Sequence, residues 1–306
     1  MDIEAGSSGG AYHPGELEVQ RRVGVREAAE RVGRGISPIL TPVAMRLMAG
    51  HRLAVAASLD ESSRVWASLL TGPPGFLRPV DERLMLIQNH PRRSDPLSRN
   101  LETRSELGVL AIHLGTRQRL RINGRALRDP ERGIFVAVEQ VYGNCPKYIQ
   151  ARRLDLEETG PETAPPERSS MLNERQRSLI ARADTLFIAS SHPKGGPDAS
   201  HRGGAPGFVR LLDERTLVFA DYPGNNMFNT LGNLLIQPRA GLLFLDFGTG
   251  DTLQLTGAAR LDWDPVKVST FRGAQGVVIT FDIEEVLETR GAGVRGRLVE
   301  YSPVNP

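Results

Sequence analysis

The strongest constraint on the fold of this 306-residue chain is an internal repeat. The segment GFLRPVDER (Gly75–Arg83) recurs as GFVRLLDER (Gly207–Arg215), at an offset of 132 residues (207 − 75). The segment RLRINGRA (Arg119–Ala126) recurs as TLQLTGAA (Thr252–Ala259), at an offset of 133 (252 − 119). A nearly constant offset over well separated matches indicates a tandem duplication, in which each copy forms the same structural unit.

The two copies also share their order of elements. LTPVAMRLMAGHRLAVAAS (Leu40–Ser58) and LNERQRSLIARADTLFIAS (Leu172–Ser190) each place an N-cap candidate, Thr41 or Asn173, before a helical stretch and a short apolar strand. Short β-branched and aromatic runs follow, broken about every 8–15 residues by Gly, Pro, Asn or Asp, without full crossover helices. The pattern predicts a mainly β fold with short helices (α+β), built as two antiparallel barrels or sandwiches.

The repeat also predicts domain boundaries. We expect a leader and helix over residues 1–39, with a disordered start, and an N-terminal copy over 40–154. Residues 155–171 are rich in Pro, Glu and Thr and are predicted to be a linker. The C-terminal copy is predicted to span 172–306.

Composition narrows the class of protein. The chain is 40% hydrophobic and 24% charged, with a formal net charge of only +2, which is typical of a soluble globular protein and predicts neither nucleic acid nor a membrane as partner. The single cysteine, Cys145, and the lack of a signal peptide or membrane-length apolar run predict a cytoplasmic location. The histidines show no metal-ligand spacing, so no metal site is predicted. GAGVRG (Gly291–Gly296) is predicted to be a hairpin turn, because too little chain follows it for a dinucleotide-binding unit.

The copies differ where polar residues gather. His201 and Arg202 fall opposite Leu69 and Leu70, so only the C-terminal copy carries this basic strand end. An asparagine-rich loop, DYPGNNMFNTLGN (Asp221–Asn233), leads into a short helix, whose first N–H groups suit a phosphate. An arginine fork with such donors and amides predicts a phosphorylated, hydrogen-bond-rich ligand, and the amides could equally read a heteroaromatic ring edge. The alternatives are a solvated His-Arg turn and asparagines that only form turns and caps.

Three segments carry a resemblance to a known family. DASHRGGAPGFV, LVFADYPGNNMFNTLGNLL and AGLLFLDFGTGDTLQLTGAA resemble pyridoxamine 5′-phosphate oxidase-like proteins, which are FMN-binding split β-barrels. The N-terminal copy, ending in VEQVYGNCPKYIQARR, looks like the partner half of two-barrel (tandem) members. The resemblance implies that FMN lies in a cleft between the barrels. It implies cofactor contacts for Ser200, His201, Arg202, Gly203, Ala220, Asp221, Tyr222, Asn225, Asn226, Met227, Asn229, Thr230 and Gln254, and Lys147 of the N-terminal copy is placed where it could reach the flavin, with simple packing as the alternative.

Two classes of function follow from this resemblance. The first is a flavin-dependent oxidoreductase that acts on an unknown small molecule with a reductant or oxidant such as NAD(P)H or oxygen, the flavin supplying the redox chemistry. No catalytic side chain is identified, and the arginine-rich substrate clamp of true pyridoxamine phosphate oxidases is not evident in the C-terminal tail. The second is a flavin- or haem-binding carrier or sensor without turnover, and a two-barrel structural protein without a ligand is a third possibility. The chain could form a homodimer, or the tandem copies could satisfy the dimer geometry alone.

Overall fold

The computed structural model describes residues 10–156, 165–291 and 294–306. The predicted disordered start and the middle of the predicted linker therefore lie outside the described residues. Among those described, the helices are α1 (Pro14–Val23), α2 (Arg26–Gly33), α3 (Pro42–Ala49), α4 (Pro96–Thr103), α5 (Glu174–Arg182), α6 (Asn229–Ile236) and α7 (Pro265–Ser269).

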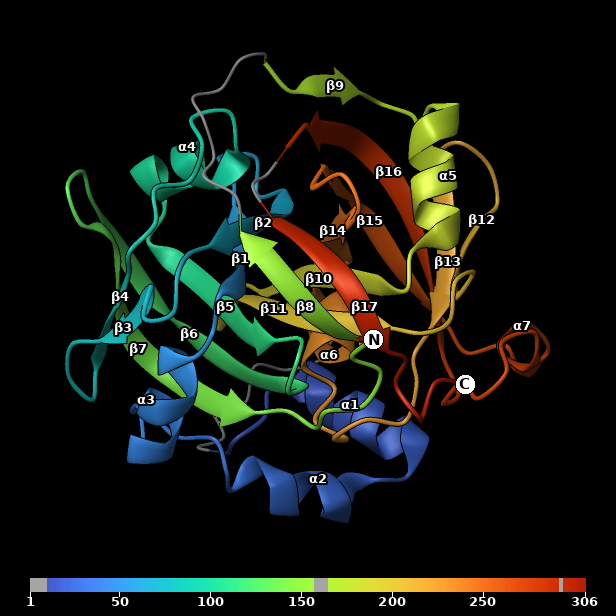
Figure 1. Ribbon diagram of the computed structural model, residues 1–306. Helices are drawn as coiled ribbons and strands as arrows, with labels where there is room; N and C mark the ends of the chain where they lie inside the picture. Colours follow the sequence, from blue (N-terminus) through green and yellow to red (C-terminus); the bar gives the residue numbers. More distant parts are fainter. Residues whose placement is uncertain (1–9, 157–164, 292–293) are drawn as a thin grey trace.

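The strands form two antiparallel sheets with the same topology (Figure 1). In the described part of the chain the first sheet has the order β2-β1-β5-β6-β7-β4-β3, and the second has β11-β10-β14-β15-β16-β13-β12 with β9 added beside β16. The strands of the first are β1 (Leu53–Leu59), β2 (Val65–Thr71), β3 (Leu77–Pro79), β4 (Leu84–Ile87), β5 (Glu106–His113), β6 (Gln118–Asp129) and β7 (Gly133–Gly143). Those of the second are β9 (Glu167–Ser169), β10 (Thr185–His192), β11 (Gly196–Gly203), β12 (Val209–Leu211), β13 (Thr216–Ala220), β14 (Arg239–Leu245), β15 (Thr252–Asp262) and β16 (Val278–Thr289). Each sheet curls around its own apolar core, which confirms the predicted fold of two tandem split barrels.

Local details repeat between the barrels. A β-bulge interrupts the β6–β7 pairing beside Gly124 and the β15–β16 pairing beside Gly257, and a Cβ at either glycine would collide with a carbonyl oxygen of the neighbouring strand. The short helices repeat a side-chain bond as well: the Nδ2 atom of Asn233 donates to Ser190 Oγ at 3.0 Å, as Asn100 Nδ2 does to the corresponding serine at 2.9 Å. This bond is common to both copies, so Asn233 has a structural role.

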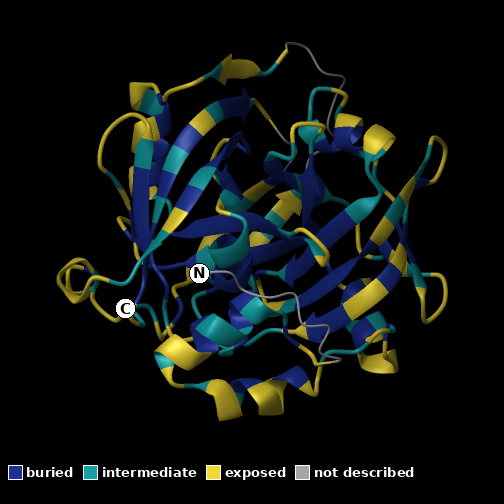
Figure 2. Ribbon diagram, turned by 180° about the vertical axis from the view of Figure 1, so that it is seen from behind, coloured by how far each residue is buried: buried dark blue, intermediate teal, exposed yellow. Residues whose placement is uncertain are grey.

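The barrels pack through a shared apolar layer. Leu110 and Phe187, from different copies, belong to one fully buried cluster between the sheets, and Figure 2 shows the strands there as continuously buried. A Cβ on Gly108 of β5 would lie 2.4 Å from Pro197 O of β11, and one on Gly241 of β14 would lie 2.6 Å from Val65 O of β2. The two corresponding glycines thus allow backbone-to-backbone contact at related points of the interface.

Alanine at either glycine is expected to destabilise the protein. Gly108→Ala and Gly241→Ala should each lower the free energy of unfolding by about 1–3 kcal/mol, because the barrels must separate to admit a methyl group. Gly143→Ala is the matched control, because a Cβ there meets nothing within 4 Å. Urea denaturation measures all three, and equal stability of the interface variants and the control would contradict this packing.

The chain ends cross the predicted copy boundaries. Helix α1 packs against α6 of the C-terminal barrel, where Gly15 and Gly232 make the closest approach. Strand β17 (Val294–Glu300) pairs with β8 (Ala151–Leu156) in a separate ribbon. The predicted GAGVRG hairpin is therefore wrong, and the reason is that both edges of β16 are already paired, with β15 on one side and with β13 and β9 on the other.

Capping explains where the short helices begin. The predicted N-caps Thr41 and Asn173 accept from Ala44 N at 3.2 Å and Gln176 N at 2.9 Å. No helix in the described part of the chain combines the length and apolarity needed to cross a bilayer.

Candidate functional site

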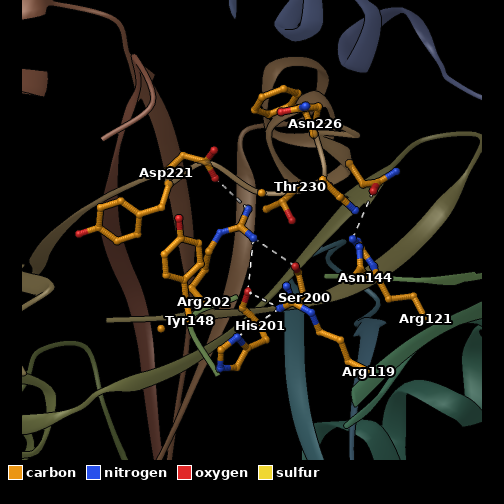
Figure 3. Close-up of a pocket in the computed structure, with 16 residues that line it drawn as sticks. Arg119, Arg121, Asn144, Tyr148, Ser200, His201, Arg202, Asp221, Asn226 and Thr230 are labelled. Carbon is orange, nitrogen blue, oxygen red and sulfur yellow. Dashed lines mark hydrogen bonds and ion pairs between the residues drawn. The ribbon is translucent and has the colours of Figure 1, made fainter. Parts of the chain in front are cut away.

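A cavity rich in arginine lies between the barrels (Figure 3). We call it the arginine cavity. Its walls come from β11, the loop and helix start over 221–230, strand β6 and the loop over 144–148. The residues that line it are Arg119, Arg121, Asn144, Tyr148, Ser200, His201, Arg202, Gly203, Asp221, Tyr222, Gly224, Asn225, Asn226, Phe228, Asn229 and Thr230. Its free volume is about 60 Å³.

Most of the predicted cofactor residues come together here. Those that line the cavity are Ser200, His201, Arg202, Gly203, Asp221, Tyr222, Asn225, Asn226, Asn229 and Thr230. Their contact with a cofactor stays a prediction.

Four predicted residues lie elsewhere. Ala220 is buried against Phe271, and Met227 is buried beside Tyr12 and Tyr142. Lys147 lies near the cavity, where its Nζ donates to Pro223 O at 3.2 Å. Gln254 contacts the N-terminal barrel instead: its Nε2 donates to Ala67 O at 2.9 Å and to Asp95 Oδ2 at 3.2 Å.

The position of Gln254 follows from how the two barrels pack against each other. Gln254 corresponds in the repeat to Arg121, and each of these late strands faces the other barrel's loop-and-helix region. The cavity of the C-terminal barrel therefore receives Arg119 and Arg121 from the N-terminal copy. Neither arginine is predicted from the sequence, although RLRING carries arginines where TLQLTG has Thr252 and Gln254.

Arg121 is held by a buried carboxylate of the other barrel. Its guanidinium is ion-paired with Asp198, and its Nε donates to Asp198 Oδ1 at 2.9 Å. The same oxygen accepts from Asn123 Nδ2 and from the Tyr142 hydroxyl, each at 3.3 Å. Arg121 Nη1 also donates to Asn229 Oδ1 at 3.2 Å. Strand β11 and helix α6 thus fix the direction of this guanidinium, and Asn123 and Tyr142 hold its carboxylate partner.

Arg202 is anchored within its own barrel. Its Nη2 lies 3.3 Å from Asp221 Oδ1, and its Nη1 donates to Ser200 Oγ at 3.2 Å. Burial raises the pKa of Asp221, and Arg202 opposes that shift. Arg202 Nε is buried and has no hydrogen-bond partner in the described part of the chain, so this guanidinium keeps an unused donor there.

Arg119 has no carboxylate partner among the described residues. Its Nη1 donates to His201 O at 3.5 Å and lies 3.3 Å from His201 Nδ1, its Nη2 lies 3.8 Å from Cys145 Sγ, and its Nε has no partner. Burial lowers its pKa to about 10, so it remains a cation at neutral pH. Burial, and next the neighbouring guanidinium of Arg119, hold the pKa of His201 well below its usual range, so the imidazole is neutral. The cavity therefore carries a positive charge that the described residues do not balance.

The start of α6 adds further donors. Its N-cap, Phe228, has a left-handed backbone (φ 60°) and no side-chain cap, which leaves the first N–H groups of the helix uncapped. In the N-terminal barrel the corresponding residue, Asp95, caps α4 by accepting from Leu97 N at 2.9 Å. Its carboxylate also accepts from Ser68 Oγ at 2.5 Å and from Gln254, which correspond to Ser200 and Arg121. An internal anion thus occupies one barrel at the position that corresponds to the arginine cavity in the other.

Helix α1 closes one wall of this region with a buried acid. Asn229 Nδ2 donates to Glu16 Oε1, and His13 N donates to Glu16 Oε2 at 2.8 Å. Burial raises the pKa of Glu16 to about 7, against the hydrogen bonds from His13 and Asn229 and the charge of Arg121.

This shift predicts a pH dependence of stability. The folded state binds the Glu16 proton more tightly than the unfolded state, in which the pKa of the carboxyl has its ordinary value of 4.5. The protonated acid therefore supports the fold below pH 4.5, and this support is lost as the pH rises through 7. Glu16→Gln should remove this loss. The free energy of unfolding of the variant, compared with that of the native chain, should therefore rise by up to about 3 kcal/mol between pH 4 and pH 8. Urea denaturation across that range checks it, and parallel curves for the two proteins would contradict it.

Comparison with known proteins assigns the C-terminal barrel to a family. Residues 172–289 match the family model described as "Pyridoxamine 5'-phosphate oxidase". This segment of the chain is a domain of that family, as the resemblance predicts. Among curated proteins, none matches the sequence.

Solved structures of low identity are also similar. A variant of HupZ from Group A Streptococcus is 16% identical, with a TM-score of 0.34, over 39% of this chain and 100% of that one. A Clostridium acetobutylicum protein related to general stress protein 26 is 12% identical, with a TM-score of 0.32, over 41% of this chain and 92% of that one. General Stress Protein 26 from Bacillus anthracis is 11% identical, with a TM-score of 0.29, over 37% of this chain and 95% of that one.

Proposed function

We propose that this chain binds FMN between its two barrels and is a flavin-dependent oxidoreductase that acts on a small molecule. The observation that carries the proposal is Arg119, a buried cation without a carboxylate partner among the described residues, beside the uncapped start of α6. A buried charge without compensation is costly, and a bound phosphate would remove that cost. The family of the C-terminal barrel supports a flavin phosphate as that anion.

The residues present fit the phosphate end of such a cofactor. Arg119 and Arg202 each keep a buried Nε–H donor, and Asn225 keeps a buried Nδ2 without a partner. Thr230 and Ser200 add hydroxyl groups to the same cavity. The free volume of about 60 Å³ is about two waters' share of liquid, which suits a phosphate-sized group. A flavin ring would lie beyond it.

An aromatic surface borders the same cavity. The rings of Tyr148 and Tyr222 lie 5.5 Å apart between centroids, and the Tyr148 hydroxyl donates to Pro223 O at 3.0 Å. These tyrosines come from different barrels, so a ring held against them would bridge the copies. When bound, FMN would supply the hydride or electron transfer, with NAD(P)H or oxygen as the other reactant. The protein would bind and orient it and exclude water from the buried phosphate.

A carrier or sensor without turnover is the second candidate. It is favoured by the lack of a free acid or base among the lining residues: His201 is held neutral by its surroundings, and Asp221 is ion-paired with Arg202. Both candidates place the protein in the cytoplasm, with its single thiol reduced.

The visible spectrum of the purified protein separates these candidates. Flavin bands, with a released cofactor of the mass of FMN, would support the proposed binding, and anaerobic bleaching by NADH or NADPH would support an oxidoreductase. A yellow protein that neither nucleotide reduces would favour the carrier. A Soret band would identify the cofactor as haem and not flavin. A colourless protein that does not bind added FMN would contradict both candidate functions.

One FMN per chain is expected despite the duplication. In the N-terminal barrel the Asp95 carboxylate accepts hydrogen bonds from Ser68 and Gln254, and the residue that corresponds to Arg202 is a leucine. Calorimetric titration of the apoprotein with FMN should therefore give a ratio near one. A ratio near two would show that the N-terminal barrel also binds.

A further inference from the structure

A second, larger cavity lies on the other side of the Arg121–Asp198 pair. It measures about 540 Å³ and is bounded by α1, by the turn over residues 192–196 and by β6 and β7. We call it the α1 chamber. Asn229 lines both this chamber and the arginine cavity, and Asp198 contributes to the wall between them.

The N-terminal barrel has a cavity of about 450 Å³ at the corresponding place, but its lining is different. The corresponding region of the N-terminal barrel holds Arg64 and Trp66, and Arg64 makes ion pairs there with Asp60 at 2.7 Å and with Glu285. In the C-terminal barrel these two positions are Gly196 and Asp198. A glycine and a short acid thus replace the two bulky side chains.

Four rings contribute flat surfaces to the walls of the chamber. The imidazoles of His13 and His192 are stacked with centroids 4.2 Å apart, and the rings of Tyr12 and Tyr142 also line the space. The Tyr12 hydroxyl donates to Ala29 O at 2.7 Å, and the Tyr142 hydroxyl is bound to Asp198. Both hydroxyls are therefore engaged, and the rings offer mainly apolar surface. Such walls suit a planar ligand.

Lys194 and Gln140 also line the chamber, but both are exposed, and the polar groups that remain in its buried part are mainly acceptors. Asn123 is more than nine-tenths buried (8% exposed), and its Oδ1 has no hydrogen-bond partner among the residues that the structure describes. Each oxygen of the Glu16 carboxylate accepts one hydrogen bond, which leaves lone pairs unused. The ring nitrogens of His13 are both engaged, with Asn233 Oδ1 and with Gly15 N. A ligand must therefore supply N–H donors to satisfy the chamber.

We propose that the α1 chamber binds a compact aromatic molecule carrying an amine- or amidine-type donor group. The ring packs among the imidazoles and tyrosines, and the donor group meets Glu16 and Asn123. The proposal does not depend on the proposed function. If both hold, the shared Asn229 brings this ligand next to the flavin site, where a substrate would lie.

Benzamidine and benzoate are the probes, since they have the same ring and opposite charge. Isothermal titration of the full chain at pH 8, without FMN, should give saturable binding of benzamidine and none of benzoate. Glu16→Gln should weaken benzamidine binding at least tenfold, because the side chain keeps its size and one acceptor oxygen but loses the negative charge. Glu18→Gln is the matched control on the solvent face of α1, where Glu18 pairs only with Arg21 and Arg22, and it should leave the affinity unchanged.

A second pair of variants tests the location without changing polar groups. Ile36→Trp places an indole in the chamber and should abolish benzamidine binding, whereas Leu127→Trp, at an exposed position, should not. The proposal is overturned if benzamidine does not bind, if it binds no better than benzoate, or if Glu16→Gln and Ile36→Trp both retain its affinity. Because no flavin is present, each of these results leaves the proposed function untouched.

Discussion

Replacing Asp198 with alanine is expected to lower the free energy of unfolding by about 3–5 kcal/mol, the largest effect of any single substitution considered for this protein. Asp198 is buried, and its carboxylate binds Arg121, Asn123 and Tyr142 of the other barrel. Its loss leaves the Arg121 guanidinium, which is 3% exposed, without a counter-charge. The interface between the barrels should therefore lose the hydrogen bonds of Asp198, and the buried Arg121 cation should lose the carboxylate that pairs with it.

Urea denaturation of two comparison variants makes this result specific. The double variant Arg121→Met with Asp198→Ala should recover at least half of the lost stability, because no unpaired charge remains. Glu139→Ala removes an exposed partner of Arg125 between β6 and β7 of one barrel, and it should cost no more than about 1 kcal/mol. A loss of under about 1 kcal/mol for Asp198→Ala alone would contradict the account of this pair.

Arg119→Met is expected to act in opposite directions on binding and on stability. FMN affinity should fall by about 1.5–3 kcal/mol, the range for hydrogen bonds to charged groups. The stability of the apoprotein should stay level or rise by up to about 2 kcal/mol, because the substitution removes a cation that no described carboxylate balances. Flavin fluorescence titration and thermal unfolding without ligand measure the two effects.

Arg202→Met provides the contrast. It should weaken FMN binding by a similar amount. It should also lower the stability of the apoprotein by about 1–2 kcal/mol, because buried Asp221 loses its partner. If Arg119→Met destabilised the apoprotein as strongly as Arg202→Met, Arg119 would be a structural cation and the anion site would lose its main support.

The fold could be predicted from the sequence because the same pattern of residues occurs twice in the chain. Two copies of the same turns, glycines and N-caps gave independent support for one antiparallel plan, and the bulges at Gly124 and Gly257 show how closely the copies agree. Strand β17 could not be predicted in this way. Its partner, β8, lies at the far end of the other copy, and no local pattern encodes that pairing.

The candidate site could be predicted only in the half that one copy supplies. The strand end at His201 and Arg202 and the loop before α6 stood out because their polar residues follow one another in the chain. Arg119 and Arg121 arrive from the other copy across the interface, so their relevance depends on how the barrels pack. The same packing places Gln254 at the corresponding site of the N-terminal barrel. Burial of Glu16 is a tertiary property too, since it depends on the seating of α1 against Gly232.

Parallel titration of the apoprotein with FMN and with riboflavin tests the central claim most directly, since the two molecules differ only in the phosphate. If the arginine cavity is a phosphate site, FMN should bind once per chain, and riboflavin should bind more weakly by about 3 kcal/mol or more, over 100-fold in dissociation constant. Equal affinities for FMN and riboflavin would contradict the claim that an anion completes this cavity.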